Sequence, residues 1–568
     1  MLKYLRVLCV LCSVCVPGVA LDRNAFTFAR YDLQARIVAT EHAISVRGRI
    51  TLRNDSPVAQ SAVALQISST LVWQSVELGG KPLVYVSQPY TTDIDHTGAV
   101  TEAIVGLPMP VQPQASVELQ IAYAGTIPAD AGRLTRIGAP EAAALRTDWD
   151  QIAASYTAVR GVGYVCWYPV SIESVSFSDE TAVFQAVGAW KQRHANSIMR
   201  VALSTVSEQS VVTNGRLVGQ KAQAEAEGTL HERNYEWSPM GLVPPAFAIA
   251  EFTLLGRTAV NIYHLARHQG LAQEYALAQE NILPFLTDWL GHIREKVAVV
   301  ELPEGNAPFD SGAILFTPLE VPDRKSVEVA VAHQVAHACI DSPRPWIDEG
   351  LAHFAQALVR ERQDGRKAAI AYMQTFLPAL VSAENQNAKG AKEEQPGAGQ
   401  PLTRATDEVY YRVKAMFVWW MLRDMIGDDA LQHAIQSYRA ADDKQPGYMQ
   451  RLLEAQSKQH LESFFDDWVY RDRGLPDFRI TAVYPRQMLP ERVTVTVTVE
   501  NTGGVAADVP VLVPIIAGEA RKRLAVPAHG SAVVRIVTPT LPGEVIVNDG
   551  SIPESDMSNN RFAVKKPE

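Results

Sequence analysis

Two histidines four residues apart, His333 and His337, lie in the run SVEVAVAHQVAHACI, which has the pattern of a helix. Side chains at positions i and i+4 of a helix share one face, so both imidazoles can reach the same metal ion. A third possible ligand, Glu349, follows after eleven residues and opens a second helix-like run, EGLAHFAQALV. These three residues therefore predict a metal site.

The spacing of the two histidines is not sufficient by itself, because His264 and His268 repeat it in YHLARHQG. No suitably placed acidic run follows this second pair, and we interpret it as structural or solvated. The first pair is followed by a loop with two prolines, then by Trp346, and then by Glu349 with Gly350 beside it. This combination favours the first pair as the metal site.

The two histidines of the first pair and the segment Trp-Ile-Asp-Glu-Gly-Leu-Ala resemble the gluzincin metallopeptidases, in particular the membrane alanyl aminopeptidase-like family. Upstream, FDSGAILF stands where that family has its Gly-x-Met-Glu-Asn strand. Downstream, YYRVKAMFVWWMLRDMIGDDALQHAIQSYR resembles the family's tyrosine-containing helix, and HLESFFDDWVYRDRGLP resembles its closing Phe-Phe-x-x-Trp segment. The resemblance covers roughly residues 24–478, and it is carried by the order of the elements more than by identity.

The resemblance implies that the three predicted ligands bind zinc, that water takes the fourth position, and that a tyrosine stabilises the oxyanion. Tyr411 is the candidate for that tyrosine. Relative to Lys414, Tyr411 stands one place earlier than in the family's Tyr-x-Lys pattern, and Tyr410 is the alternative. His353 lies one turn after Glu349, and we predict it to be a polar neighbour of the site, with an extra ligand as the alternative.

The sequence departs from the family pattern at four places. Gln334 stands where the family has its catalytic glutamate, and loss of a general base costs about 10²–10⁴ in rate. The gap between His337 and Glu349 is shorter than is usual for these aminopeptidases. Asp310 stands where the amine-binding glutamate would be, so it is the substrate-binding candidate, and Gln356 occupies a place where the family often has Glu. These departures put exopeptidase specificity in doubt.

The chain of 568 residues is long enough for several domains, and its patterns predict a multidomain α+β protein. Alternating apolar and polar residues over 21–245 predict a large antiparallel β domain. Residues 246–475 change to strand–helix order and then to helices, which fits the thermolysin-like zinc-peptidase domain that the resemblance implies, with a polar mobile insert at 384–405. Residues 476–568 return to alternation and predict an immunoglobulin-like β-sandwich, similar to bacterial adhesion-type domains.

Residues 1–20 have the composition of a secretory signal peptide. Lys3 and Arg6 make a basic start, residues 7–16 are apolar, and small residues lead to a cleavage site near Ala20. No later stretch reaches eighteen apolar residues, so we expect no membrane span in the mature chain. The sequence therefore predicts a secreted or periplasmic protein.

Cysteine content and charge restrict the remaining possibilities. Three cysteines fall in the predicted signal, and none of them follows a small residue, which disfavours a lipoprotein. Only Cys166 and Cys339 remain, so a disulfide framework is excluded and we expect two buried thiols, with one bridge as the alternative. The net charge of −10 argues against a general nucleic-acid binder.

Three functions are compatible with this sequence. The first is a secreted, zinc-binding, aminopeptidase-like protein of the metallopeptidase class whose peptide hydrolysis is weak or lost because of Gln334. The second is an active zinc metallopeptidase that uses another base, such as Asp348, Glu328 or a residue brought in by the fold. The third is a non-catalytic binding or adhesion protein without metal. The expected partner is a peptide or protein, and the oligomeric state stays open.

Overall fold

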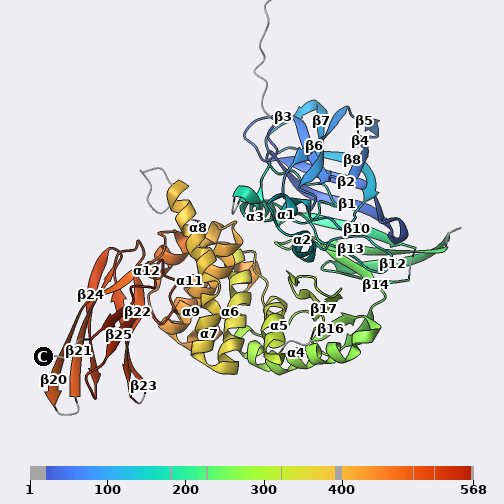
Figure 1. The fold of residues 1–568 in the computed structure, drawn as a ribbon. Helices are drawn as coiled ribbons and strands as arrows, with labels where there is room; N and C mark the ends of the chain where they lie inside the picture. The colour runs from blue at the N-terminus through green and yellow to red at the C-terminus, as the bar shows by residue number, and fades with distance from the viewer. Residues whose placement is uncertain are drawn as a thin grey trace, which may run out of the picture.

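The computed structural model describes residues 21–564 apart from 180–181, 207, 226–227, 321–322, 391–399, 490–491 and 517. Figure 1 shows a β-rich N-terminal part, a central helical part and a C-terminal β part, which follow one another along the chain. This is the multidomain α+β architecture that the sequence patterns predict. The boundaries of the individual domains stay predictions.

The N-terminal part contains one large sheet whose strands alternate buried and exposed side chains, as Tyr31, Leu33, Ala35 and Ile37 show by being buried in β1. The sheet has eight strands in the order β12 (Arg216–Glu225), β13 (Gly228–Trp237), β10 (Ile198–Thr205), β1 (Phe26–Val38), β2 (Ala43–Asn54), β8 (Ser116–Thr126), β4 (Leu71–Leu78) and β5 (Lys81–Pro82). A second sheet contains β3 (Gln60–Ser68), β7 (Ala99–Val111) and β6 (Tyr85–Thr91).

The pairing in the large sheet is antiparallel, as predicted, except between β1 and β10, which run parallel. Parallel neighbours need a long connection, and here much of the chain lies between the two strands. That connection includes the short helices α1 (Gly132–Arg136) and α2 (Glu141–Thr147) and the longer α3 (Ala182–His194).

Next to this part, a five-stranded sheet positions the candidate site from one side. Its order is β15 (Thr253–Gly256), β16 (Val260–His264), β17 (Val297–Leu302), β19 (Ile314–Pro318) and β18 (Phe309–Ser311). The pairs β16–β17 and β17–β19 are parallel, whereas β18 runs antiparallel to β19 at the edge. A three-stranded sheet of β11 (Ser210–Thr213), β14 (Phe247–Ala250) and β9 (Thr157–Val159) shares a hydrophobic core with it.

The helical part places α5 (Arg324–Cys339) between α4 (Gln269–Leu290) and α6 (Pro345–Asp364), with which it makes close contacts. It continues with α7 (Arg366–Gln374), α8 (Leu377–Gly390), the π-helical turn η5 (Val409–Lys414), α9 (Ala415–Ile426), α10 (Asp428–Ser437), α11 (Tyr448–Ser457) and α12 (Glu462–Phe465). Its centre is apolar: Trp346 and Trp419 are fully buried and stack with ring centroids 5.1 Å apart. This stacking fixes the start of α6 against α9.

The C-terminal part consists of two sheets whose buried side chains join one hydrophobic core with the helices. One sheet contains β20 (Phe478–Leu489), β21 (Arg492–Asn501) and β24 (Gly530–Thr538). The other contains β23 (Gly518–Val526), β22 (Ala507–Ile515), β25 (Glu544–Val547) and β26 (Arg561–Ala563). An immunoglobulin-like sandwich stays a prediction for this part.

Several other sequence predictions can be compared with the described residues. Cys166 and Cys339 are both free and buried, so the prediction of two buried thiols is confirmed. No helix among the described residues is long and apolar enough to cross a membrane. The predicted signal at 1–20 lies outside the described residues. Of the predicted insert 384–405, residues 391–399 also lie outside them, while residues 384–390 belong to α8, so a mobile loop is wrong for that start.

Candidate metal centre

Helix α5 brings the two predicted histidine ligands together in the interior. Asp323 is the N-cap of this helix, and its carboxylate accepts a hydrogen bond from the backbone N–H of Lys325. His333 and His337 are both buried, and their Nε2 atoms lie 3.2 Å apart. The helical spacing therefore directs both rings to one point, as the sequence predicts.

Helix α6 supplies the carboxylate. Pro345 starts this helix, so Glu349 lies in its first two turns. Glu349 Oε2 lies 3.6 Å from Nε2 of His333, and Oε1 lies 4.0 Å from Nε2 of His337. Ligand atoms about 2.0–2.1 Å from one tetrahedral zinc ion lie roughly 3.3 Å apart. These three residues form the group of potential metal ligands among the described residues, and their donor set and spacing fit zinc.

The residue before the third ligand supports the site from behind. Asp348 Oδ2 lies 3.4 Å from Nδ1 of His337, so the imidazole has its other nitrogen facing His333. Burial alone would lower the pKa of His337, but Asp348 and Glu349 raise it to about 9. Burial raises the pKa of Asp348, and the pair of Asp348 and His337 therefore holds one proton near neutral pH. A carboxylate on the distal nitrogen of a ligand histidine fixes its orientation.

The other titratable groups of the centre respond differently to burial. Burial lowers the pKa of His333 to about 3, and the neighbouring His337 adds to this, so its imidazole is neutral. Burial likewise lowers the pKa of His353 to about 3. The ring of His353 lies 5.1 Å from that of His333, which agrees with the predicted polar neighbour, and His353 is outside the group of potential ligands.

Gln334 is fully buried and points toward the sheet rather than into the helix bundle. Its Nε2 donates a hydrogen bond to Oδ1 of Asp310, which lies on the edge strand β18. Its Oε1 is buried and has no hydrogen-bond partner among the described residues. Asp310 thus lies at the centre, as predicted, but its contact with Gln334 follows from the sheet order and is absent from the sequence pattern.

A cavity of about 170 Å³ opens beside these residues, and its walls include Asp310, Glu349, Glu408, Tyr411 and Arg412. Tyr411 is therefore placed beside the site. Tyr410 is fully buried and is not among the residues that line the cavity. Its ring instead lies 5.5 Å from Nζ of Lys414, which pairs with Glu384 and Asp472 at 2.8 Å each. The geometry favours Tyr411 over its alternative.

Arg412 is a residue of the site that the sequence reasoning missed. Its Nε donates to Oε2 of Glu349 at 3.0 Å, and its Nη1 donates to Glu408, also at 3.0 Å. Glu408 in turn pairs with Lys191 of α3 at 3.3 Å. Burial opposes the ionisation of Glu349, but Arg412 and the histidines hold its pKa well below the usual range. The one available signal was the i,i+4 spacing of Glu408 and Arg412.

The loop between the two metal-binding helices is held by a buried network. Ser342 Oγ lies 2.8 Å from the hydroxyl of Tyr438, and that hydroxyl donates to Asp443 at 2.8 Å. Asp443 also pairs with Arg344 at 2.7 Å, and the backbone N–H of Arg344 donates to Ser342. The network ties the loop to Tyr438 and Asp443 and so fixes where Glu349 lies relative to the histidines.

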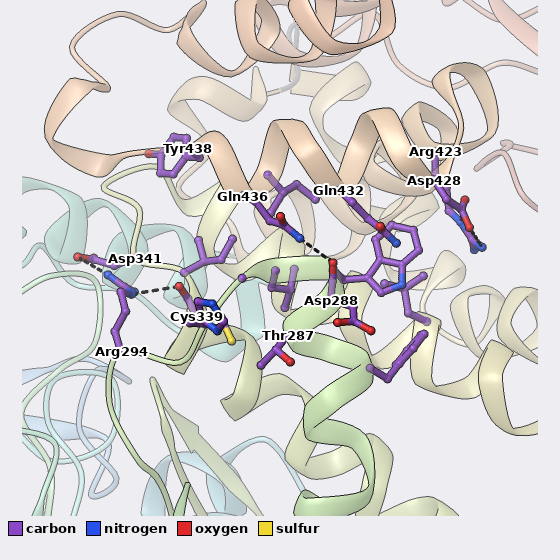
Figure 2. A pocket seen from close by; sticks show the side chains of 18 of the residues that line it. Thr287, Asp288, Arg294, Cys339, Asp341, Arg423, Asp428, Gln432, Gln436 and Tyr438 are labelled. Atoms are coloured by element: carbon purple, nitrogen blue, oxygen red, sulfur yellow. Dashed lines mark hydrogen bonds and ion pairs between the residues drawn. The ribbon is translucent and has the colours of Figure 1, made fainter.

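A larger cavity of about 1,160 Å³ lies beside the C-terminal end of α5, and none of the metal ligands lines it. Figure 2 shows that several of its polar side chains are already paired, some of them with backbone carbonyls. Arg294 lies 3.3 Å from Asp341 and donates to the backbone carbonyl of Cys339, and Gln436 donates to the carbonyl of Asp288. The smaller cavity, not this one, is therefore the candidate for substrate binding.

No known family model matches this chain, and no curated protein matches it. Among solved structures it is similar to an M1 zinc metallopeptidase from Deinococcus radiodurans, with 16% identity, a TM-score of 0.49, and coverage of 79% of this chain and 95% of that chain. A mutant from the same organism, bound to a Tyr-Ser-Ala substrate, has 16% identity and a TM-score of 0.48 with the same coverage. A two-domain M1 zinc metallopeptidase mutant bound to L-arginine has 15% identity and a TM-score of 0.47, with coverage of 80% of this chain and 96% of that chain. At these values the likeness assigns no activity to this chain.

Proposed function

We propose that this protein is a secreted, zinc-binding, aminopeptidase-like protein of the metallopeptidase class that binds peptides and hydrolyses them weakly or not at all. The observation that carries the proposal is the convergence of His333, His337 and Glu349 beside a cavity, with a glutamine in the position of the base. Export rests on the sequence of residues 1–20 and is part of the proposal.

The protein's contribution would be to hold the metal and the peptide. Zinc bound by two histidines and a glutamate polarises a carbonyl and lowers the pKa of water. Asp348 orients the ring of His337, and Tyr411 would donate its hydroxyl hydrogen to the oxygen of the attacked carbonyl. Burial strongly raises the pKa of Tyr411, so this hydroxyl stays protonated and able to donate.

The weakness of hydrolysis follows from the amide of Gln334, which cannot accept a proton near neutral pH. The two bases that the sequence suggests are already engaged elsewhere. Asp348 faces His337, and Glu328 accepts hydrogen bonds from Asn281 at 2.6 Å and Gln363 at 2.7 Å. The expected deficit is therefore about 10²–10⁴ relative to an enzyme with a well-placed base.

Hydrolysis of aminoacyl and peptide substrates by the zinc-loaded protein tests the proposal. An ordinary enzyme turns over at roughly 10 s⁻¹, so a deficit of at least 10² predicts about 0.1 s⁻¹ or less. The same preparation should bind unhydrolysed peptides in calorimetry. Turnover near the ordinary rate would reject the weak-hydrolysis proposal, and a preparation that takes up no zinc would favour the non-catalytic binding protein.

A further inference from the structure

We propose that Asp310, held by Gln334, accepts the proton of the attacking water in the weak hydrolysis that this chain retains. This inference rests on the proposed function, since it needs the zinc site and a bound peptide. It assigns to Asp310 a role different from the amine-binding role that the sequence suggests.

The position of Asp310 is the first argument. Strand β18 runs antiparallel to β19 at the sheet edge, and this edge brings Asp310 against the amide that stands in place of the base. Its side chain is exposed to the cavity that Glu349, Tyr411 and Arg412 also line. A carboxylate at this point is open to water and to substrate.

The hydrogen-bonding capacity of Gln334 is the second argument. Its Nε2 donates to Asp310, which leaves Oε1 as an acceptor, and this atom is buried without a partner among the described residues. A water between the two side chains can donate one hydrogen to Oε1 of Gln334 and the other to the carboxylate. Two carboxylates in this contact would repel each other, whereas a glutamine and an aspartate complement each other.

The surrounding charges leave Asp310 able to take part in proton transfer. Arg412 and His353 favour the carboxylate form of Asp310, and Glu349 opposes it. His337 also interacts with Asp310 electrostatically. Burial raises the pKa of Asp310, while Arg412 and the hydrogen bond from Gln334 lower it. A raised pKa brings a carboxyl group nearer to the working pH of a general base.

The proposed step balances without a further reactant. The water oxygen bonds to the peptide carbonyl carbon, and one water proton moves to a carboxylate oxygen of Asp310. When the C–N bond breaks, that proton passes to the leaving nitrogen, and Asp310 is again a carboxylate. The products are a carboxylic acid and an amine.

The test compares wild type with Asp310→Asn, Asp310→Glu and the control Glu304→Gln, an exposed carboxylate six residues earlier. Zinc content, peptide affinity by calorimetry, and kcat and KM are measured for each, with free and N-acetylated peptides. We expect Asp310→Asn to keep one zinc per chain and its peptide affinity, and to lose at least about 100-fold in kcat on both kinds of peptide. Asp310→Glu should recover part of this loss, and the control should match wild type.

Other outcomes overturn the inference in distinguishable ways. If Asp310→Asn weakens binding and turnover of free peptides alone and spares acetylated ones, Asp310 binds the amine instead. If zinc is present and the variant keeps its kcat within about threefold, or wild type hydrolyses nothing, Asp310 is not the proton acceptor and the zinc-binding function stands. A wild type without zinc removes the proposed function and this inference together.

Discussion

Replacing Gln334 by glutamate should raise peptide hydrolysis, and the structure allows the size and the pH dependence of the gain to be worked out. The substitution keeps the shape of the side chain and adds a group that accepts protons. A general base contributes about 10²–10⁴ in rate, which corresponds to about 2.7–5.5 kcal/mol of barrier. The contact with Asp310 sets the pH at which this gain is seen.

In Gln334→Glu, two carboxyl groups would occupy the space of the present amide–carboxylate hydrogen bond. Two such groups share one proton, so the second ionisation moves to higher pH. We therefore expect the gain to appear mainly on the alkaline side. Adding Asp310→Asn removes the repulsion, so the acidic limb of the rate profile should move to lower pH in the double variant.

Initial rates from pH 5 to pH 9 with zinc-loaded protein measure this effect. Gln432→Glu makes the same chemical change on α10, at the wall of the larger cavity, and should leave the rate within about twofold. Zinc content must be equal in all variants. If Gln334→Glu with full zinc gave no gain in hydrolysis at any pH, the view that Gln334 occupies the position of the missing base would be refuted.

Three further predictions concern the supports of the site. Because His337 has a pKa of about 9, zinc binding at pH 7 should release about one proton per ion. For the same reason, the affinity for zinc should rise roughly tenfold per pH unit below pH 9. Calorimetry in buffers of different ionisation enthalpy measures this proton release. In Gly350→Ala the new Cβ would lie 2.7 Å from Cβ of Ala415. The cost of overpacking, about 1–3 kcal/mol, should exceed the gain in helix propensity and lower the midpoint of thermal unfolding. An unchanged midpoint would contradict the packing argument. Tyr438→Phe removes one hydrogen-bond donor from the buried Asp443, which should lower the free energy of unfolding by about 1.5–3 kcal/mol and weaken zinc binding. Unaltered zinc affinity would show that the loop network does not position the metal ligands.

The metal ligands could be predicted from sequence because their signals are local or nearly so. An i,i+4 pair fixes His333 and His337 on one helix face wherever the helix lies, and Glu349 lies near the start of the next helix, after a short loop. The alternation and helical periodicity of the three regions likewise depend on neighbouring residues, so the α+β architecture followed.

The contacts that decide the chemistry are not local. Asp310 reaches Gln334 because β18 pairs with β19 at the sheet edge, and no spacing in the sequence encodes that pairing. Arg412 reaches Glu349 across 63 residues, through the way η5 packs on α6. The parallel pairing of β1 with β10 was missed for the same reason. Such features depend on tertiary packing, which overrides local pattern.

The zinc content of purified protein tests the central claim most directly. The account predicts one zinc per chain in the wild type and loss of most of it in His333→Ala and in Glu349→Ala, while His264→Ala, which alters the other histidine pair, keeps the wild-type content. A wild-type chain without zinc, or zinc that survives both ligand substitutions, would contradict the assignment of the site.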